Sequence, residues 1–378
     1  MATYYWVGGD GTWDGVSTAN WSNTSGGASG FGPPLSVDTV IFDDNSGTGT
    51  CTTAIGSVSS AITLNSTNLI FRLGSDHVNG GIFTFTKGSL DLGGYTLSAS
   101  GSVSSGTGIR LILFNDGKIK ITGSGFTVWN YANITNFSYT GTSTVELSAA
   151  ASSGNRTLNH GFQGGGSEAN AISLYVTAGT DNISANSPLY TKTVDFTGFS
   201  GNRLNITHFV YGDLILSPTM TISAGNLTTS FLATSGTQSV TTNGVAMDFP
   251  LTINAPSATV SFQDAFTLGS TRSFTLTNGT VELKDGATST VGAFATSGTN
   301  QKYLQSTLNG SQATLSQSSG IVNVSNLTIK DINAAGGAVW QAFVTSGNVD
   351  SGNNTGWDFF TQLGKYIYTR RKNKRILL

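Results

Sequence analysis

The sequence predicts an all-β protein, and within that class a right-handed parallel β-helix. Short strand-like runs rich in Val, Ile, Phe and Thr recur over about 300 residues, separated by Asn-Gly, Gly-Gly, Ser-Gly and Asp-Gly pairs that mark turns. No apolar stripe with a 3.6-residue period extends over three turns, so long helices are not expected. Only 10% of the residues are charged, while Gly, Ser, Thr and Asn are abundant. A surface made of hydroxyls and amides suits stacked coils that carry polar ladders.

A β-sandwich or a β-barrel would also explain many short strands. Two features favour the β-helix. The strand-like runs continue without a clear linker, and weak internal repeats place an aromatic residue a few positions before a small-Gly-Thr turn. These repeats lie at 137–149, 231–244 and 294–310. The ATSGT segments shared by the last two, at 233–237 and 295–299, are 62 residues apart, which corresponds to three coils of about 20 residues each.

The expected domain organisation follows from the needs of a coil stack. The two ends of such a stack expose unpaired N–H and C=O groups and therefore require caps. We expect an N-terminal cap rich in Trp and Gly at 1–45, a β-helical body at 46–346, a closing coil at 347–363 and a short basic arm at 364–378.

Both expected caps contain tryptophan. Trp6, Trp13 and Trp21 fall within sixteen residues and are separated by turns that contain Gly and Asp. Because the face of an indole can stack on a sugar ring, one interpretation is an aromatic platform for carbohydrate. The favoured interpretation is a cap whose indoles plug the open end of the core, since tryptophan is usually mostly buried. Trp340 and Trp357 are expected to close the other end.

Two stretches of the chain resemble known β-helical proteins. WVGGDGTW (6–13), NWS (20–22) and DTVIF (38–42) are similar to the opening of β-helical passenger and adhesin-like surface proteins. SNLTIKDINAAGGAVWQAFVTSGNVDSGNNTGWDFF (325–360) is similar to the last coils of such proteins in bacteria and in tailed phages of aquatic bacteria. The resemblance covers roughly 80 of the 378 residues and implies a β-helical surface or virion protein.

The function expected from this resemblance is that of a phage tail fibre or tailspike. Such a protein would be a homotrimeric component of the virion that contacts other virion proteins and binds host surface polysaccharide. The alternatives are a head fibre or capsid decoration protein, a bacterial surface adhesin and a polysaccharide depolymerase. The sequence shows no secretory signal peptide and no run that approaches 18 apolar residues. We therefore expect a virion location, because phage particles assemble in the cytoplasm and leave by lysis.

The sequence gives no sign of a cofactor or a metal site. His77, His160 and His208 are too widely spaced to form a zinc motif. The oxygen-rich stretches 43–49 and 350–354 do not match the spacing of an EF-hand, so they are interpreted as turns rather than calcium sites. No glycine-rich segment opens a helix in the manner of a phosphate-binding loop.

Acidic residues are the one group from which a catalytic site could be built. Some β-helices cleave polysaccharides with two or three carboxylates on one sheet face, and stacked coils can bring such groups together. The candidate catalytic residues are Asp195, Asp213, Asp264 and Glu282. Because isolated Asp residues commonly cap turns, the sequence favours a protein that is not an enzyme.

The C-terminus concentrates positive charge. Six of the 18 Lys and Arg residues fall in the last fourteen positions, and without them 12 basic residues face 20 acidic ones, a net charge of −8. An acidic body is an unlikely nucleic-acid binder. The end could be a solvated tail, a phosphate-binding segment without a folded module, or an assembly arm that docks on an acidic surface of another subunit or virion protein. The expected arm residues are Tyr366, Tyr368, Arg370, Arg371, Lys372, Lys374, Arg375 and Leu377.

Overall fold

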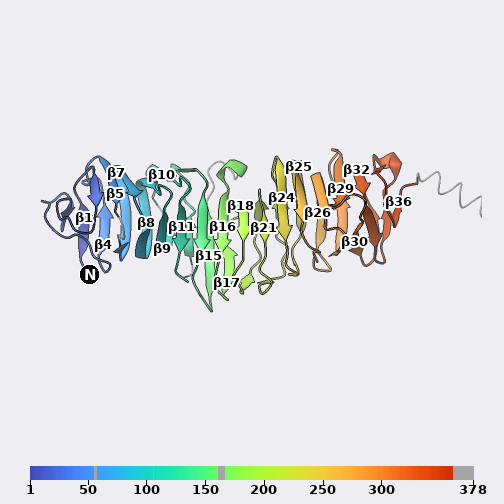
Figure 1. The fold of residues 1–378 in the computed structure, drawn as a ribbon, viewed down its shortest axis with the longest axis horizontal. Coiled ribbons are helices and arrows are strands. Elements are labelled where there is room, and N and C mark those ends of the chain that lie inside the picture. Colours follow the sequence, from blue (N-terminus) through green and yellow to red (C-terminus); the bar gives the residue numbers. More distant parts are fainter. Residues whose placement is uncertain (55–57, 105, 126, 161–166, 361–378) are drawn as a thin grey trace, which may run out of the picture. The chain divides into compact units, whose positions relative to one another are not determined.

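The structure, a computed structural model, describes residues 1–54, 58–104, 106–125, 127–160 and 167–360. The predicted fold class is confirmed, because the described strands stack in parallel from one coil to the next as in a β-helix (Figure 1). Two single-turn 3-10 helices, η1 (Glu168–Asn170) and η2 (Val344–Ser346), interrupt the strands. The chain forms two compact units, Met1–Leu204 (unit 1) and Asn205–Leu378 (unit 2). The expected basic arm lies outside the described residues.

Unit 1 contains nineteen of the described strands. In chain order they are β1 (Thr3–Trp6), β2 (Gly11–Trp13), β3 (Trp21–Ser22), β4 (Thr39–Phe42), β5 (Gly49–Thr53), β6 (Val58–Ser59), β7 (Ala61–Leu73), β8 (His77–Asp91), β9 (Thr96–Val103), β10 (Arg110–Leu113), β11 (Lys118–Ile121), β12 (Thr127–Tyr131), β13 (Phe137–Thr140), β14 (Thr144–Leu147), β15 (Asn155–His160), β16 (Ile172–Val176), β17 (Asn182–Ala185), β18 (Leu189–Asp195) and β19 (Asn202–Arg203). Long strands such as β7 and β8 pass through more than one sheet before the chain turns.

The strands of unit 1 belong to one continuous hydrogen-bonded sheet that bends into three parallel faces, here called its three sheets, and a coil passes through each in turn. On the first sheet Ile62 pairs with Phe83 of the next coil, which lies 21 residues later. The second sheet pairs β7 with the end of β8, and the third pairs the start of β8 with β9. Coil length varies, because Phe83 pairs with Ser102 after 19 residues whereas Ser102 pairs with Trp129 after 27. The irregular coils agree with the weak internal repeats of the sequence.

The core of unit 1 follows from simple alternation along each strand. In β7 the side chains of Ile62 and Leu64 point inward and are fully buried, while Thr63 between them points outward. Inward side chains of successive coils then stack, as in the 4.9 Å contact between the rings of Phe42 and Phe71. Each fully buried aromatic or aliphatic side chain of this kind contributes about 1.5–3 kcal/mol.

The N-terminal segment supplies both a first coil and a covering layer. Strand β1 pairs in parallel with β4, and β2 with β5, so these strands already belong to the stack. Strand β3 instead runs antiparallel to β1 and pairs Trp6 with Trp21. Trp6, Trp13 and Trp21 are at most 1% exposed, and the ring of Trp21 meets those of Trp6 and Trp13 edge-on at 5.0 and 5.1 Å. Side chains buried to this extent cannot offer a face to a sugar.

Unit 2 contains the other described strands. In chain order they are β20 (His208–Val210), β21 (Leu214–Ile215), β22 (Thr221–Ile222), β23 (Thr229–Phe231), β24 (Gly236–Thr241), β25 (Leu251–Phe262), β26 (Ser273–Leu283), β27 (Thr288–Val291), β28 (Ala293–Thr296), β29 (Lys302–Ser306), β30 (Ala313–Gln317), β31 (Ile321–Asn323), β32 (Leu327–Lys330), β33 (Ile332–Ala335), β34 (Val339–Gln341), β35 (Val349–Asp350) and β36 (Trp357–Asp358). On the sheet that includes β26, β29 and β32, the inward side chains of Val281, Leu304 and Ile329 stack at intervals of 23 and 25 residues.

The last coils of unit 2 bring together the two tryptophans expected at that end. Trp340 in β34 pairs with Trp357 in β36, and their rings meet edge-on at 4.9 Å. Trp340 is 3% exposed, and its indole N–H donates to the carbonyl oxygen of Ala335 at 3.1 Å. Trp357 is partly exposed. The pair therefore covers the apolar interior of the final described coils.

We expect the change Gly279→Ala to destabilise unit 2 by about 2–3 kcal/mol. Gly279 has φ +94°, and a Cβ atom there would lie 2.1 Å from the carbonyl oxygen of Ala255 on the neighbouring coil. Gly286→Ala is a matched control, because Gly286 has φ +69° but open space around it. The control should cost only the conformational strain, about 1 kcal/mol. Urea unfolding of both variants measures the difference, and equal losses would show that the coils relax around the added methyl group.

Candidate functional site

Two of the candidate catalytic residues hold turns in unit 2. Asp264 accepts hydrogen bonds from the backbone N–H of Thr242 at 2.9 Å and of Asn243 at 2.5 Å. Asp213 accepts from the backbone N–H of Ser239 at 2.7 Å. Both carboxylates therefore satisfy donors on an adjacent coil, which is the turn-capping role that Asp often plays.

Asp195 has a similar local role in unit 1. Its Oδ1 atom accepts from the backbone N–H of Thr197 at 2.7 Å, two residues later, in an Asx turn. On the same outward row, Asp195 pairs with Tyr175, which pairs with Glu146. Two coils at about 4.8 Å each separate the two carboxylates by roughly 10 Å.

Two lysine side chains prevent Glu146 from acting as the general acid in a catalytic carboxylate pair with Asp195. Its carboxylate contacts Lys118 Nζ at 2.6 Å and Lys120 Nζ at 3.3 Å. Burial by itself raises the pKa of Glu146, but the hydrogen bonds and charges of the two lysines outweigh it and leave the pKa below its ordinary value. Glu146 therefore stays ionised near neutral pH and cannot donate a proton to a leaving group.

Glu282 lies on an outward polar row that crosses several coils of unit 2. In this row each side chain pairs with the next across neighbouring strands, in the order Ser239, Ser261, Glu282, Gln305 and Lys330. We call it the Glu282 row. The carboxylate of Asp213 binds the backbone N–H of Ser239, which lies two coil spacings, about 10 Å, from Glu282. This exceeds the carboxylate separations that glycoside hydrolysis uses, which are about 5–9.5 Å.

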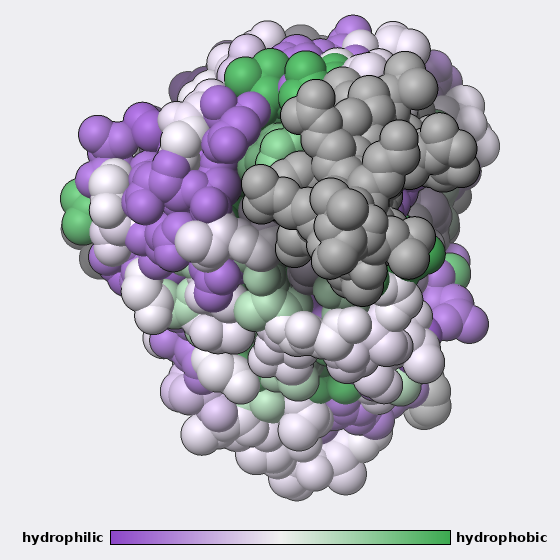
Figure 2. Space-filling view, turned by 90° about the vertical axis from the view of Figure 1, so that its right-hand side faces the viewer, coloured by the Kyte–Doolittle hydropathy of each residue, from purple (hydrophilic) through white to green (hydrophobic). Residues whose placement is uncertain are grey.

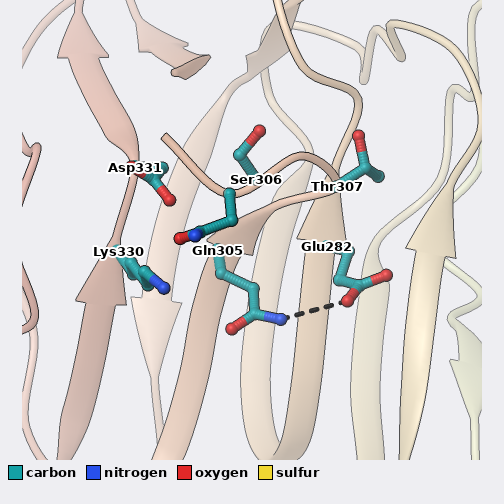
Figure 3. Close-up of a pocket in the computed structure, with 7 residues that line it drawn as sticks. Glu282, Gln305, Ser306, Thr307, Lys330 and Asp331 are labelled. Atoms are coloured by element: carbon teal, nitrogen blue, oxygen red, sulfur yellow. Dashed lines mark hydrogen bonds between the residues drawn. The ribbon is translucent and has the colours of Figure 1, made fainter. Parts of the chain in front are cut away.

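A surface cavity of about 150 Å³ opens beside the Glu282 row. It is lined by Glu282, Gln305, Ser306, Thr307, Asn309, Lys330 and Asp331. Gln305 donates from Nε2 to Glu282 Oε1 at 3.0 Å, and Figure 3 shows this contact together with Lys330 and Asp331 across the cavity. Strands β26, β29 and β32 supply the three side chains of the row that line the cavity. The cavity therefore combines a carboxylate, an amide and an ammonium group.

Hydrogen bonds hold the rim of this cavity in place. Asp331, which is 2% exposed, accepts from the backbone N–H of Gly310 at 3.0 Å and from Asn353 Nδ2 at 2.7 Å. Thr307 donates to Asp285 Oδ1 at 3.0 Å and accepts from the Asp285 backbone N–H at 3.0 Å. These contacts within the chain fix the turns that border the cavity. Asp331 is committed to the turn and is not free to act as a general base.

These groups can bind a ligand with many hydroxyls, but they do not form a catalytic pair. Glu282 can accept hydrogen bonds, Lys330 can donate them, and Gln305 can do both.

In the part of the chain that the structure describes, no cluster of three or more His, Cys, Asp or Glu side chains could hold a metal ion. Over the same residues, no helix has the length and apolar character needed to cross a bilayer.

Among the histidines, His77 is notable because it is buried within an aromatic cluster in unit 1. Its ring centroid lies 5.0 Å from that of Trp13 and 6.0 Å from that of Phe71. Its Nε2 atom is 3.3 Å from Ser59 Oγ. Burial lowers the pKa of His77 to about 4, because the charged imidazolium loses its hydration in this apolar site.

We expect His77 to make unit 1 acid-sensitive between pH 6.5 and about 4. In that window the unfolded chain, with an ordinary histidine pKa near 6.5, takes up a proton that the folded chain does not. Stability therefore falls as the pH falls, by roughly 3 kcal/mol in total. Urea unfolding of the wild type and of His77→Gln from pH 7 to pH 4 tests this. The variant should lose less stability on acidification, and parallel curves would contradict the assignment.

Comparisons with known protein families, curated proteins and solved structures give no match for this chain. The resemblance to adhesin-like and virion proteins thus rests on the sequence motifs at the two ends of the chain. The function has to be argued from the geometry described above.

Proposed function

We propose that the protein is a structural component of a phage particle, a tail fibre or tailspike that binds host surface glycans and does not cleave them. The observation that carries the proposal is the Glu282 row and its cavity, where hydroxyl, amide and charged groups repeat at the coil spacing on an outward face. A polysaccharide can follow the part of the row from Glu282 to Lys330, where neighbouring coils offer hydrogen-bonding groups about 4.8 Å apart.

The low charge of the chain supports the same role. Only 10% of residues are charged, so most outward positions carry Thr, Ser, Asn or Gln. On the face in Figure 2, polar and weakly polar residues predominate and apolar residues occur in small patches. Asparagine ladders join neighbouring coils through uncharged groups. In one of them Asn278 Nδ2 donates to Asn254 Oδ1 at 2.6 Å, and Asn300 Nδ2 donates to Asn278 Oδ1 at 2.7 Å. Coils with so few charged groups on their outward faces suit assembly with other virion proteins as a homotrimer.

The proposal is tested by mass spectrometry of density-banded phage particles from the source sample. We expect the chain in the particles at a few to tens of copies, as for a fibre or spike. Hundreds of copies would indicate a capsid decoration or head fibre protein instead. Absence from the particles would end the virion proposal and favour a bacterial surface adhesin.

A separate measurement tests the depolymerase alternative. We expect the purified chain to leave its bound polysaccharide at full length, because the described candidate carboxylates of unit 2 are too far apart or committed to turns. Size-exclusion chromatography of the glycan after incubation would detect shortening. Wild type and Glu282→Gln should give the same elution profile. Shortening that Glu282→Gln abolishes would make Glu282 a catalytic residue and the protein an enzyme.

A further inference from the structure

We propose that Tyr303 and the Glu282 row form a subsite for one uncharged pyranose unit of a polysaccharide. The inference rests on the glycan-binding part of the function proposed above and specifies its location and ligand. Tyr303 supplies a flat aromatic surface, and Glu282, Gln305 and Lys330 supply hydrogen-bonding groups beside it.

Tyr303 is exposed in a position where packing does not require an aromatic residue. It lies in β29 between the inward side chains of Lys302 and Leu304, so its own side chain points outward. It is 44% exposed, and its neighbours on the row are Thr280 and Thr328. The negative face of an aromatic ring attracts the weakly positive C–H groups of an apolar surface. One face of a pyranose ring presents such C–H groups.

The polar groups of the row lie close enough to Tyr303 to contact a sugar stacked on its ring. Gln305 lies two residues beyond Tyr303 on the same face of β29, about 6.6 Å away along the strand. Glu282 and Lys330 flank Gln305 at about 4.8 Å on either side. A ring stacked on Tyr303 can therefore direct hydroxyls toward Gln305 and one of its two neighbours, and the adjoining sugar of the chain can reach the other. Figure 3 shows that Glu282, Gln305 and Lys330 come from three neighbouring strands and border one cavity.

The charges around the cavity favour an uncharged sugar over an acidic one. Glu282 and Lys330 offset each other, and Asp331 adds a buried negative charge at the rim. A uronic acid carboxylate would approach two carboxylates for one ammonium group, which is unfavourable. A pair of neighbouring hydroxyls meets no such penalty, because one can donate to Glu282 while the other accepts from Lys330.

Glycan microarrays and titration calorimetry with the full chain test this subsite. We expect the wild type to bind uncharged glycans and Tyr303→Ala to bind them about 10-fold more weakly, whereas Tyr303→Phe retains the ring and the affinity. Glu282→Gln and Lys330→Ala should each weaken binding about 5-fold or more. The matched control is Tyr95→Ala, since Tyr95 is 40% exposed but lies in unit 1. Thermal unfolding confirms that each variant is folded.

The outcomes separate this inference from the proposed function. If the wild type binds glycans and Tyr303→Ala binds them equally well, the sugar lies elsewhere and only the subsite is wrong. A preference for carboxylated glycans would overturn the assignment of an uncharged ligand. If the wild type binds no glycan, both the subsite and the glycan-binding function fall.

Discussion

Replacing Trp21 with alanine should lower the free energy of unfolding of unit 1 by about 3–5 kcal/mol. Trp21 is 1% exposed and lies between the rings of Trp6 and Trp13, with the ring of Phe42 6.3 Å away. Its removal deletes a large apolar contact and leaves a cavity at the end of the stack, where few atoms can move in to fill it. The covering strand β3 would lose its only large side chain.

Chemical denaturation, followed by near-ultraviolet circular dichroism, measures this effect. Val16→Ala is the control within the same segment, because Val16 is 80% exposed and its truncation should change stability by less than about 0.5 kcal/mol. A loss below about 1 kcal/mol for Trp21→Ala would mean that the indole cluster adds little to the cap.

The sequence was sufficient to predict the fold class and the burial of the first three tryptophans. Alternation in runs such as residues 61–64, together with frequent turn pairs, identifies strands without any knowledge of their partners. The burial of Trp6, Trp13 and Trp21 follows from their size and from the need to cover an open end. Both predictions depend on local composition, which a single sequence contains in full.

Register is the property that the sequence did not reveal. The intervals between paired residues differ from coil to coil, for example 19 between Phe83 and Ser102 but 29 between Trp129 and Leu158, because turns of different length are inserted at the corners. Without the register, Glu282 could be named as a candidate but not matched with its neighbours in the row. The exposure of Tyr303 likewise depends on which face of β29 points inward, and this is decided by the packing of Leu304.

Buried charge was also missed, because ion pairs across coils have no local signal. Arg156 and Asp181 are 25 residues apart in the sequence, yet both side chains are fully buried and paired inside unit 1. Arg156 Nε and Nη2 contact the two carboxylate oxygens of Asp181 at 2.8 and 2.7 Å. A guanidinium in a predicted strand is ordinarily taken as an outward residue.

Asp181→Ala should destabilise unit 1 by about 3–5 kcal/mol, because it leaves the guanidinium of Arg156 buried without its counter-charge. The remaining contacts of that group are a hydrogen bond to the Ala178 carbonyl at 2.7 Å and the ring of Phe199 at 5.6 Å. Neither carries a formal negative charge. As a control, Lys284→Ala removes a partly exposed pair with Asp285 and should change stability little, because solvent screens such pairs.

A double variant shows whether the pair itself stabilises the fold. Removing both charges with Arg156→Met and Asp181→Leu should cost less than Asp181→Ala alone, because no unpaired ion remains in the interior. Urea unfolding of the wild type, of Arg156→Met alone, of Asp181→Leu alone and of the double variant completes a double-mutant cycle. The coupling free energy between the two side chains is the departure from additivity in this cycle. Additive losses would mean that water reaches Arg156 once Asp181 is gone. A double variant as stable as the wild type would show that apolar packing can replace the pair, and that the strong penalty belongs to the isolated charge.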